Sequence, residues 1–295
     1  DALATGADIV ITGRTADPSM VVGVCMQHFG WAETDYHRLA GATIAGHLIE
    51  CGTQVCGGIS THWLECDDPA DIGFPVVEVD GDGNTVVTKP AGTGGQVTLE
   101  TVKEQLLYEI GDPRNYLSPD CRVDFTTLDV ARQGTDRVAV RGATGHAPPD
   151  TYKVSATYRD GWRASAQLTV FGRDAVAKAR RAGEAVLARL ARHGTTFARS
   201  HVECLGANAC AAGVLPVPEL LETVLRISVA DADKAKLERF AREVMPLVTA
   251  GPQGTTGYAG GRPKPSPVFS YWPCRIARDR VSLRVQQPAA EPRHA

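Results

Sequence analysis

The stretch FPVVEVDGDGNTVVTKPAGTGGQVTLETVKEQLLYEI, residues 74–110, places two short apolar runs, a glycine cluster and an amphipathic segment in direct succession. The apolar runs flank the turn formers DGDGN, a pattern that predicts a β-hairpin. Thr98 is a typical helix N-cap residue, and apolar residues recur at helical spacing from there until Gly111. Residues 74–110 therefore predict a mixed α/β fold in which a glycine loop joins a hairpin to a helix.

The glycine loop, Gly92-Thr93-Gly94-Gly95, is a candidate anion site. Free backbone N–H groups at a helix N-terminus suit a phosphate or a carboxylate, and Lys89 just before the loop would add a positive charge. The spacing matches neither the phosphate loop, whose lysine follows the glycines, nor the dinucleotide fingerprint. A plain turn with a solvated Lys89 is the alternative, and the local residues leave both interpretations open.

The residues before this stretch predict the arrangement of the first half. Residues 9–11, Ile-Val-Ile, are β-branched without alternation, as in a strand buried on both faces. Asp17-Pro18 has the pattern of an N-cap followed by proline at the first helical position, and a second helix is expected over residues 41–51. These elements predict an open, mostly parallel sheet in the first half.

The second half has a different pattern, which predicts an α+β arrangement containing hairpins. Residues 151–172 alternate on both sides of Asp160-Gly161, which predicts a β-hairpin with its turn there. A basic helix over residues 174–192 follows, then a strand, VLRISVAD, and a helix capped by Asp231 or Asp233.

Three divisions of the chain are expected from these patterns. Residues 1–140 form the C-terminal part of an α/β core, and residues 141–286 form an α+β second part. Residues 287–295 have the composition of a disordered tail. Residues 250–272 form a long irregular loop whose aromatic residues favour order.

Composition excludes several classes of function. The net charge is −3 and the pI is near 6.3, so neither nucleic acid nor a membrane is an expected partner. No apolar run is long enough to cross a bilayer. The eight cysteines include no CxxC pair, which favours reduced thiols in the cytoplasm. Because the first residue is Asp1 rather than methionine, the natural N-terminus is expected further upstream.

The segment GHLIECG offers the best acid–base candidates. His47, Glu50 and Cys51 lie at i, i+3 and i+4, so they share one face of the predicted helix. A histidine and a glutamate at this spacing could serve as an acid–base pair. No third metal ligand can be assigned, so no metal site is predicted. The alternative is a histidine at the edge of an apolar face whose hydrogen bonds are made by its neighbours.

Two further segments are candidates for binding an anionic substrate. Arg14 follows the predicted first strand, where ligands of open α/β sheets collect, and could bind a carboxylate or phosphate. The loop Tyr258, Gly260, Gly261 and Arg262 is glycine-rich, is flanked by aromatic residues and carries an arginine.

Several long motifs occur in one order and carry a family resemblance. They are GADIVITGRTADPS, LAGATIAGHLIECGTQVCGG, the stretch from Gly73 to Pro113, and VTAGPQGTTGYAGGRPK. From Asp1 to about Arg280 the chain resembles the acyclic terpene utilisation protein AtuA family, formerly a domain of unknown function (DUF1446). Members of that family carry an additional N-terminal stretch, which agrees with a chain that is a fragment.

The resemblance implies a cytoplasmic role in the breakdown of branched acyclic isoprenoids. It favours an enzyme, a hydratase or lyase acting on a branched acyl-CoA, with coenzyme A as part of the substrate; no cofactor is identified. The alternative is a non-catalytic partner or assembly factor of a carboxylase of the geranyl-CoA or methylcrotonyl-CoA type. In the first case His47 and Glu50 would be the catalytic pair, and Arg14, Lys89 and Arg262 would bind anions. The oligomeric state is not predicted.

Overall fold

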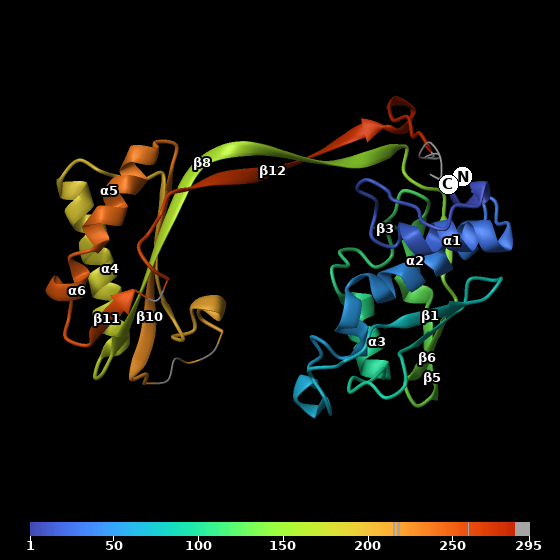
Figure 1. Cartoon of the computed structure of the whole chain (residues 1–295), viewed down its shortest axis with the longest axis horizontal. Helices are drawn as coiled ribbons and strands as arrows, with labels where there is room; N and C mark the ends of the chain where they lie inside the picture. The colour runs from blue at the N-terminus through green and yellow to red at the C-terminus, as the bar shows by residue number, and fades with distance from the viewer. Residues whose placement is uncertain (215, 217–218, 259, 287–295) are drawn as a thin grey trace, which may run out of the picture. The chain divides into compact units, whose positions relative to one another are not determined.

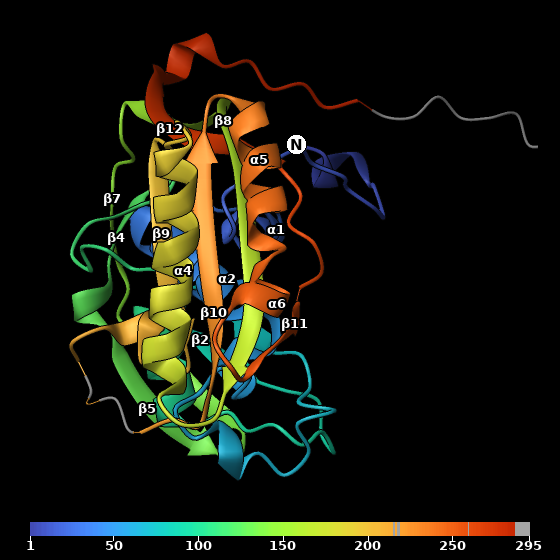
Figure 2. The same ribbon diagram turned by 90° about the vertical axis from the view of Figure 1, so that its left-hand side faces the viewer.

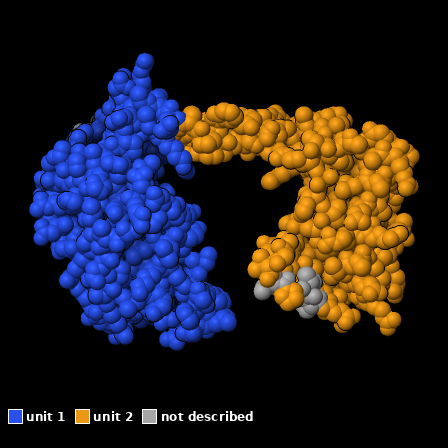
Figure 3. All heavy atoms as spheres, turned by 180° about the vertical axis from the view of Figure 1, so that it is seen from behind, with its two compact units in different colours: residues 1–153, 275–295 blue, residues 154–274 orange. Residues whose placement is uncertain are grey.

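The computed structural model describes residues 1–214, 216, 219–258 and 260–286, so the predicted tail at 287–295 lies outside the described residues. The chain divides into two compact units (Figure 3). Unit 1 contains residues 1–153 and the C-terminal segment from Arg275, and unit 2 contains residues 154–274.

Unit 1 packs helices against two small antiparallel sheets (Figure 1). The helices are α1 Ser19–Phe29, α2 Tyr36–Glu50 and α3 Leu99–Leu107. The first sheet has the order β1-β2-β6-β5, formed by Val76–Val79, Thr85–Thr88, Arg137–Arg141 and Asp129–Gly134. The second has the order β3-β4-β7, formed by Tyr116–Leu117, Arg122–Asp124 and Thr144–His146.

Helix α2 is the centre of unit 1. All its residues from Leu39 to Leu48 are buried, and α1, α3 and strands of both sheets pack around it. Two glycines make this packing possible. A Cβ on Gly41 would overlap the backbone of Gly83, and a Cβ on Gly46 would lie 2.5–2.8 Å from Pro18. The hairpin turn and the segment before α1 therefore press directly onto the α2 backbone.

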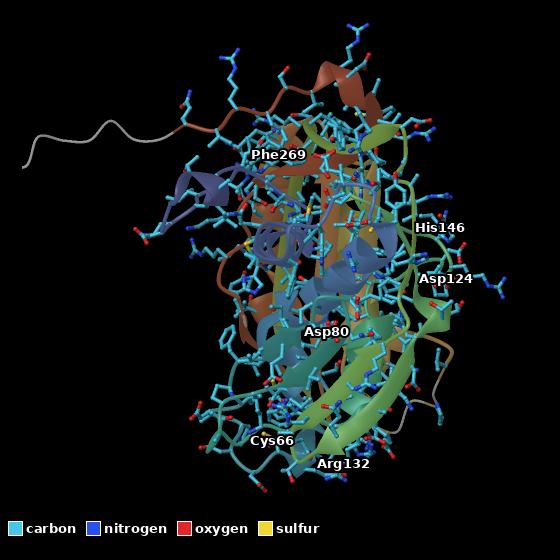
Figure 4. The ribbon with its side chains drawn as sticks, turned by 90° about the vertical axis from the view of Figure 1, so that its right-hand side faces the viewer. Cys66, Asp80, Asp124, Arg132, His146 and Phe269 are labelled. Atoms are coloured by element: carbon cyan, nitrogen blue, oxygen red, sulfur yellow. The ribbon has the colours of Figure 1, made fainter. Side chains whose placement is uncertain are left out.

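The predicted hairpin and the helix after the glycine loop are confirmed. Strands β1 and β2 pair in antiparallel register. The carboxylate of Asp80, labelled in Figure 4, accepts hydrogen bonds from the backbone of Asp82 and Asn84, which closes the turn. At the start of α3, Thr98 and Thr101 exchange side-chain and backbone hydrogen bonds as a capping box. This helix ends at Leu107, before the predicted end.

The mixed α/β class is confirmed, but the parallel arrangement predicted for the first half is wrong. Every strand pair whose register the structure gives is antiparallel. Residues 9–11 form no strand, and the side chains of Ile9 and Ile11 are 81 % and 92 % exposed. A strand buried on both faces needs neighbouring strands, and residues 9–11 pair with no strand among the described residues.

Helix predictions in the first half were partly right. Helix α1 follows Asp17-Pro18 and stops at Gly30, as expected. Its N-cap is Pro18, however, and no side chain makes the cap hydrogen bond, so Asp17 is not the cap. Helix α2 begins at Tyr36, five residues before the predicted start, and is followed by Gly52.

Unit 2 is a two-layer arrangement of helices on a five-stranded antiparallel sheet. The sheet order is β11-β8-β10-β9, with β12 also paired to β8. The strands are β8 Thr151–Phe171, β9 Arg199–Leu205, β10 Glu222–Asp231, β11 Thr255–Tyr258 and β12 Ser266–Ala277. Helices α4 Ala175–Arg192 and α5 Lys234–Val244 cover one face of this sheet (Figure 2). The short helix α6 spans Leu247–Ala250.

The predicted hairpin at residues 151–172 is wrong, because β8 is one continuous strand. Gly161 has φ +81° within that strand, and a Cβ there would lie 2.8 Å from the carbonyl oxygen of Asp231 on β10. The glycine therefore serves close packing between neighbouring strands, not a turn. The loop expected over residues 250–272 also contains β11 and the first part of β12.

The other predicted elements of unit 2 are confirmed. Helix α4, strand β10 and helix α5 lie where the periodicity placed them. Asp233 caps α5 by accepting a hydrogen bond from the backbone N–H of Ala235. Asp231 accepts a hydrogen bond from Lys236 on the same helix.

Candidate functional site

His47 and Gln105 hold the ends of α2 and α3 together through a reciprocal pair of hydrogen bonds. The Nε2 atom of His47 lies 2.8 Å from the carbonyl oxygen of Gln105, and the side-chain Nε2 of Gln105 donates to the carbonyl oxygen of His47 at 2.9 Å. Both side chains are buried. This interaction joins the two helices at their C-terminal ends.

The hydrogen bond from His47 determines which ring nitrogen is free to act. A carbonyl oxygen only accepts, so Nε2 carries the proton and Nδ1 keeps the lone pair in the neutral ring. Burial lowers the pKa of His47, and the bond to Gln105 and three carboxylates oppose this lowering. His47 is therefore a neutral imidazole near pH 7, and its unprotonated ring nitrogen is Nδ1.

Glu50 and Cys51, on the next turn of α2, form a second pair. The Cys51 thiol donates to the Glu50 carboxylate at 2.6 Å. Burial, followed by the hydrogen bond to Glu50, raises the pKa of Cys51 to about 11. The thiol thus stays protonated at neutral pH and is a poor nucleophile. Glu50 acts electrostatically on His47 but makes no hydrogen bond with it among the described residues.

Residues that the sequence did not indicate surround this pair. Glu109, which follows α3, and Asp17, which precedes α1, both raise the pKa of His47, after Glu50 in strength. The Tyr116 ring lies 6.2 Å from the His47 ring, centroid to centroid. Burial, followed by the same three carboxylates, raises the pKa of Tyr116. Histidine, tyrosine and carboxylates therefore meet at the carboxyl ends of α2 and α3.

One signal in the sequence could have indicated part of this arrangement. Gln105 lies among the apolar residues of the amphipathic segment, between Val102 and Leu106, where a polar side chain needs a buried partner. Asp17, Glu109 and Tyr116 lie far from His47 in sequence and carry no local pattern that points to it.

Two backbone donors of the glycine loop, those of Gly94 and Gly95, are used within the protein. Gly94 N–H donates to Asp71 at 2.7 Å, and Gly95 N–H donates to Ile72 at 3.1 Å. The side chain of Cys66, labelled in Figure 4, donates to the Gly94 carbonyl oxygen at 3.3 Å. A Cβ on Gly95 would lie 2.6 Å from the Cys56 carbonyl oxygen. The loop glycines thus let two segments pack closely, and an anion there would have to replace these bonds.

Lys89 is buried rather than solvated. Its side chain is 4 % exposed, and its ammonium group donates to the Thr93 carbonyl oxygen at 2.8 Å and to the Thr93 hydroxyl at 2.9 Å. Asp136 lies 3.5 Å away, and its other carboxylate oxygen accepts from the backbone of Val97. Lys89 therefore ties the glycine loop, which begins at Gly92, to the turn that contains Asp136.

The remaining anion-binding candidates lie in both units. Arg14, in unit 1, is exposed and forms no ion pair with any described residue. In unit 2, the Tyr258 hydroxyl lies 2.8 Å from the Met245 sulfur, and burial raises the pKa of this tyrosine. Gly260, Gly261 and Arg262 are exposed beyond β11. Since these candidates belong to different units, each remains a separate prediction.

The described residues contain neither a cluster of metal ligands nor a helix that could span a membrane. No group of three histidine, cysteine or carboxylate side chains there could hold a metal ion. Within the same ranges, no helix has both the length and the apolar character needed to cross a bilayer.

Comparison with known proteins identifies the family. Neither the curated proteins nor the solved structures contain a significant match to this chain. A family model described as acyclic terpene utilisation family protein AtuA matches residues 1–287. Since this match covers nearly all of the sequence, the chain belongs to the AtuA family of acyclic terpene utilisation proteins.

Proposed function

We propose that this chain supplies acid–base groups to a cytoplasmic enzyme of isoprenoid breakdown, a hydratase or lyase that acts on a branched acyl-CoA. The observation that carries the proposal is the buried His47 ring, whose Nε2 is bonded to the Gln105 carbonyl oxygen while Nδ1 keeps its lone pair. A neutral imidazole with a fixed tautomer is suited to serve as a general base at neutral pH.

Hydration of an enoyl-CoA needs one base and one acid. The base takes a proton from water, the hydroxide oxygen bonds to the β-carbon, and the acid donates a proton to the α-carbon as the double bond is lost. In this proposal Nδ1 of His47 takes the proton from water. The Glu50 carboxylate, which accepts the Cys51 hydrogen bond at the start, receives that proton through solvent and passes it to the α-carbon. Elimination of water runs through the same groups in reverse.

Coenzyme A would bind through its phosphates. Arg14 of unit 1 and Arg262 of unit 2 are two separate candidates for this contact, because each is exposed and forms no ion pair with a described residue. Lys89 and the loop Gly92-Thr93-Gly94-Gly95 are weaker candidates, because the Lys89 ammonium group and the N–H groups of Gly94 and Gly95 already make bonds within unit 1.

Turnover tests the reaction. Purified protein is mixed with branched enoyl-CoA or 3-hydroxyacyl-CoA, and the loss or gain of the enoyl absorbance is followed. We expect His47→Gln and Glu50→Gln each to lower kcat by at least about a hundredfold. Glu100→Gln, at the opposite end of α3, is the control and should retain activity. Equal turnover in all four proteins would exclude the proposed roles.

A second function, that of a non-catalytic partner of a geranyl-CoA or methylcrotonyl-CoA-type carboxylase, rests on a different observation. Phe269, Tyr271 and Trp272 of β12 are exposed, and aromatic side chains are enriched in protein interfaces. Affinity capture with purified carboxylase subunits tests this function. Loss of capture in Trp272→Ala would support it, and absence of capture at micromolar concentrations would argue against it.

A further inference from the structure

Strand β8 has an unpaired edge over residues 154–161 of unit 2. Along its other edge this stretch pairs with β12, and the two strands together are called the ribbon here (Figure 1). The ladder between β8 and β10 begins only at Trp162, and the pairs with β11 begin at Leu168. Among the described residues, no strand other than β12 pairs with residues 154–161. A row of backbone N–H and C=O groups is therefore available along this edge.

Side-chain contacts across the ribbon show which residues share a face. The rings of Tyr158 and Trp272 lie 6.3 Å apart, centroid to centroid. The Ser155 hydroxyl lies 3.4 Å from the Tyr271 hydroxyl. Even-numbered residues of β8 thus lie on the same face as even-numbered residues of β12, and odd-numbered residues lie on the opposite face.

Two prolines show which backbone groups face the free edge. Pro267 and Pro273 of β12 have no N–H group, so both ring nitrogens point to the outer edge, away from β8. Opposite residues in an antiparallel pair exchange either both backbone bonds or none. The odd-numbered pairs are therefore the unbonded ones, and the even-numbered residues join the two strands. Consequently Ser155 and Thr157 of β8 direct their N–H and C=O groups to the free edge.

The free edge of β8 lacks the features that protect the outer edge of β12. The segment VSATY, residues 154–158, contains no proline, no glycine and no charge. Lys153 and Arg159 flank it, but the Arg159 guanidinium lies over the Trp162 ring, 4.7 Å from its centroid. Natural proteins protect exposed edges with prolines, charges or short strands, and β8 is a strand of 21 residues. An unprotected edge of this kind favours pairing with another strand.

The ribbon also leaves aromatic side chains uncovered on both faces. Tyr158 and Trp272 on one face are 47 % and 63 % exposed, and Phe269 and Tyr271 are exposed on the other (Figure 4 labels Phe269). A two-stranded ribbon is only marginally stable unless further strands or a packing surface are added. Additional strands would therefore stabilise this part of unit 2.

We propose that the free edge of β8 pairs with the same edge of a second copy of this chain, antiparallel about a two-fold axis. An axis perpendicular to the ribbon preserves its faces, so Tyr158 and Trp272 of both copies lie on one face. The strand order becomes β12-β8-β8-β12, in which Pro267 and Pro273 block both outer edges.

This closure favours a second copy over any other occupant. A second copy supplies a free edge of the same length, and the prolines stop the sheet at four strands, so association ends at the dimer. The proposal goes beyond both proposed functions and depends on neither.

Sedimentation equilibrium of the purified chain alone tests the proposal. A reductant is present, so that the exposed Cys210 and Cys274 form no disulfide. At the higher micromolar concentrations we expect twice the 31.4 kDa mass of the chain. In the dimer the N–H groups of Ser155 and Thr157 should exchange with solvent more slowly than in the monomer, as NMR would show. A monomer at every concentration, or a mass that rises beyond the dimer, would overturn the proposal.

Variants at Thr157 locate the interface. Thr157→Pro removes an N–H that faces the free edge and leaves the bonds to β12 in place. Because both copies lose a donor, the dissociation constant should rise about thirtyfold. Thr157→Lys, which adds like charges to the shared edge, should also weaken association, and it tests the edge even if the proline variant does not fold.

Thr157→Val is the matched control, because it keeps the backbone N–H and should remain dimeric. An unchanged dissociation constant in Thr157→Lys and in folded Thr157→Pro would place the interface elsewhere and overturn the proposal. Loss of the dimer in Thr157→Val to the same extent as in Thr157→Pro would overturn it as well, since the side chain and not the edge would then hold the copies together.

Discussion

Unit 1 places polar side chains in the middle of its core, whereas the core of unit 2 is almost entirely apolar. The buried polar residues of unit 1 are Thr43, His47, Ser60, Thr85, Thr101, Gln105 and Ser118; those of unit 2 are Thr195 and Thr223. The buried side-chain atoms found without a hydrogen-bond partner, on Thr85, Gln105 and Ser118, all belong to unit 1.

This difference indicates that unit 2 is optimised for stability and that chemistry is to be expected in unit 1. A polar group in a core lowers stability unless its hydrogen bonds are made. The unpartnered polar atoms of unit 1 therefore reduce its stability, and such atoms often mark functional sites. Unit 2 instead has the regular helix-on-sheet packing that optimises burial, with Phe240 of α5 fully buried against the sheet. Unit 2 is therefore the more regular scaffold, and unit 1 carries the candidate site.

Truncation of the apolar core should have the largest effect. Phe240→Ala removes a fully buried ring that contacts Phe197 edge to face, and should lower the free energy of unfolding of unit 2 by about 3–5 kcal/mol. Urea unfolding measures this loss, and the His47 resonances should not move. A shift of those resonances would show that the two cores are coupled and do not behave as separate units.

Removal of a buried charge in unit 1 should have the next largest effect. Lys89→Met keeps most of the buried side-chain volume but removes the donors to Thr93 and the partner of Asp136. The expected loss is about 2–3 kcal/mol in the free energy of unfolding of unit 1. Lys103→Met, an exposed residue on α3, is the matched control and should change stability little. If Lys89 and Lys103 variants were equally stable, Lys89 would not hold the glycine loop.

The buried histidine should make the stability of unit 1 depend on pH. The pKa of His47 is lowered in the folded chain, so below the unfolded value of about 6.5 the unfolded chain binds more protons. The free energy of unfolding should therefore fall as the pH drops below about 6.5, by up to about 1.4 kcal/mol per pH unit. Urea titrations between pH 5 and 8 measure the slope.

The contribution of His47 to that slope is isolated by substitution. In His47→Gln the free energy of unfolding should depend less steeply on pH between about pH 6.5 and 5. The slope should be smaller by up to about 1.4 kcal/mol per pH unit, which corresponds to one proton. Asp231 of unit 2, whose pKa is lowered to about 2 by bonds from Asp233, Lys236 and Ala198, loses its stabilising effect only at lower pH. An unchanged slope in His47→Gln would mean that another group causes it.

Thiol alkylation should distinguish exposed cysteines from buried ones by how fast they react. This experiment tests reactivity and not stability. Burial raises the pKa of Cys56 and of Cys121 to about 11, so neither thiol should react at pH 7.5. Cys210 and Cys274 are exposed and should be alkylated first by iodoacetamide, as peptide mass spectrometry would show. Early modification of Cys121 in folded protein would indicate that the core of unit 1 opens more readily than its packing implies.

The sequence predicted elements well wherever one segment carried the whole signal. Helix α5 shows its apolar stripe and its Asp233 cap within a dozen residues, and the hairpin around Asp80 shows its turn formers. The hairpin predicted at residues 151–172 was wrong because Asp160-Gly161 is a local turn signal. The continuous pairing of β8 with β10 depends on residues far away in the sequence and leaves no such local signal. The strand predicted at residues 9–11 was wrong because β-branched residues show only a preference for strands. They do not show whether a neighbouring strand is present to pair with.

The candidate site followed the same rule. His47 and Glu50 could be proposed from the sequence because their spacing on one helix is a local pattern; their catalytic role stays a prediction. Gln105, Glu109 and Tyr116 reach His47 through packing of α3 and β3 against α2, so no spacing in the sequence relates them to it. The anion-binding candidates could not be ranked from sequence. Only the structure shows that the Lys89 ammonium group already bonds to Thr93, whereas Arg14 forms no ion pair with a described residue.

The boundary between the two units determines how the chain can be cut into parts. Unit 2 is an insertion in unit 1: the chain leaves unit 1 within β8, after Lys153, and returns within β12, at Arg275. Both crossings lie in strands that pair with each other and not in a linker. A single proteolytic cut therefore cannot release unit 2, and a shortened chain that keeps only unit 1 would have to join two strand ends.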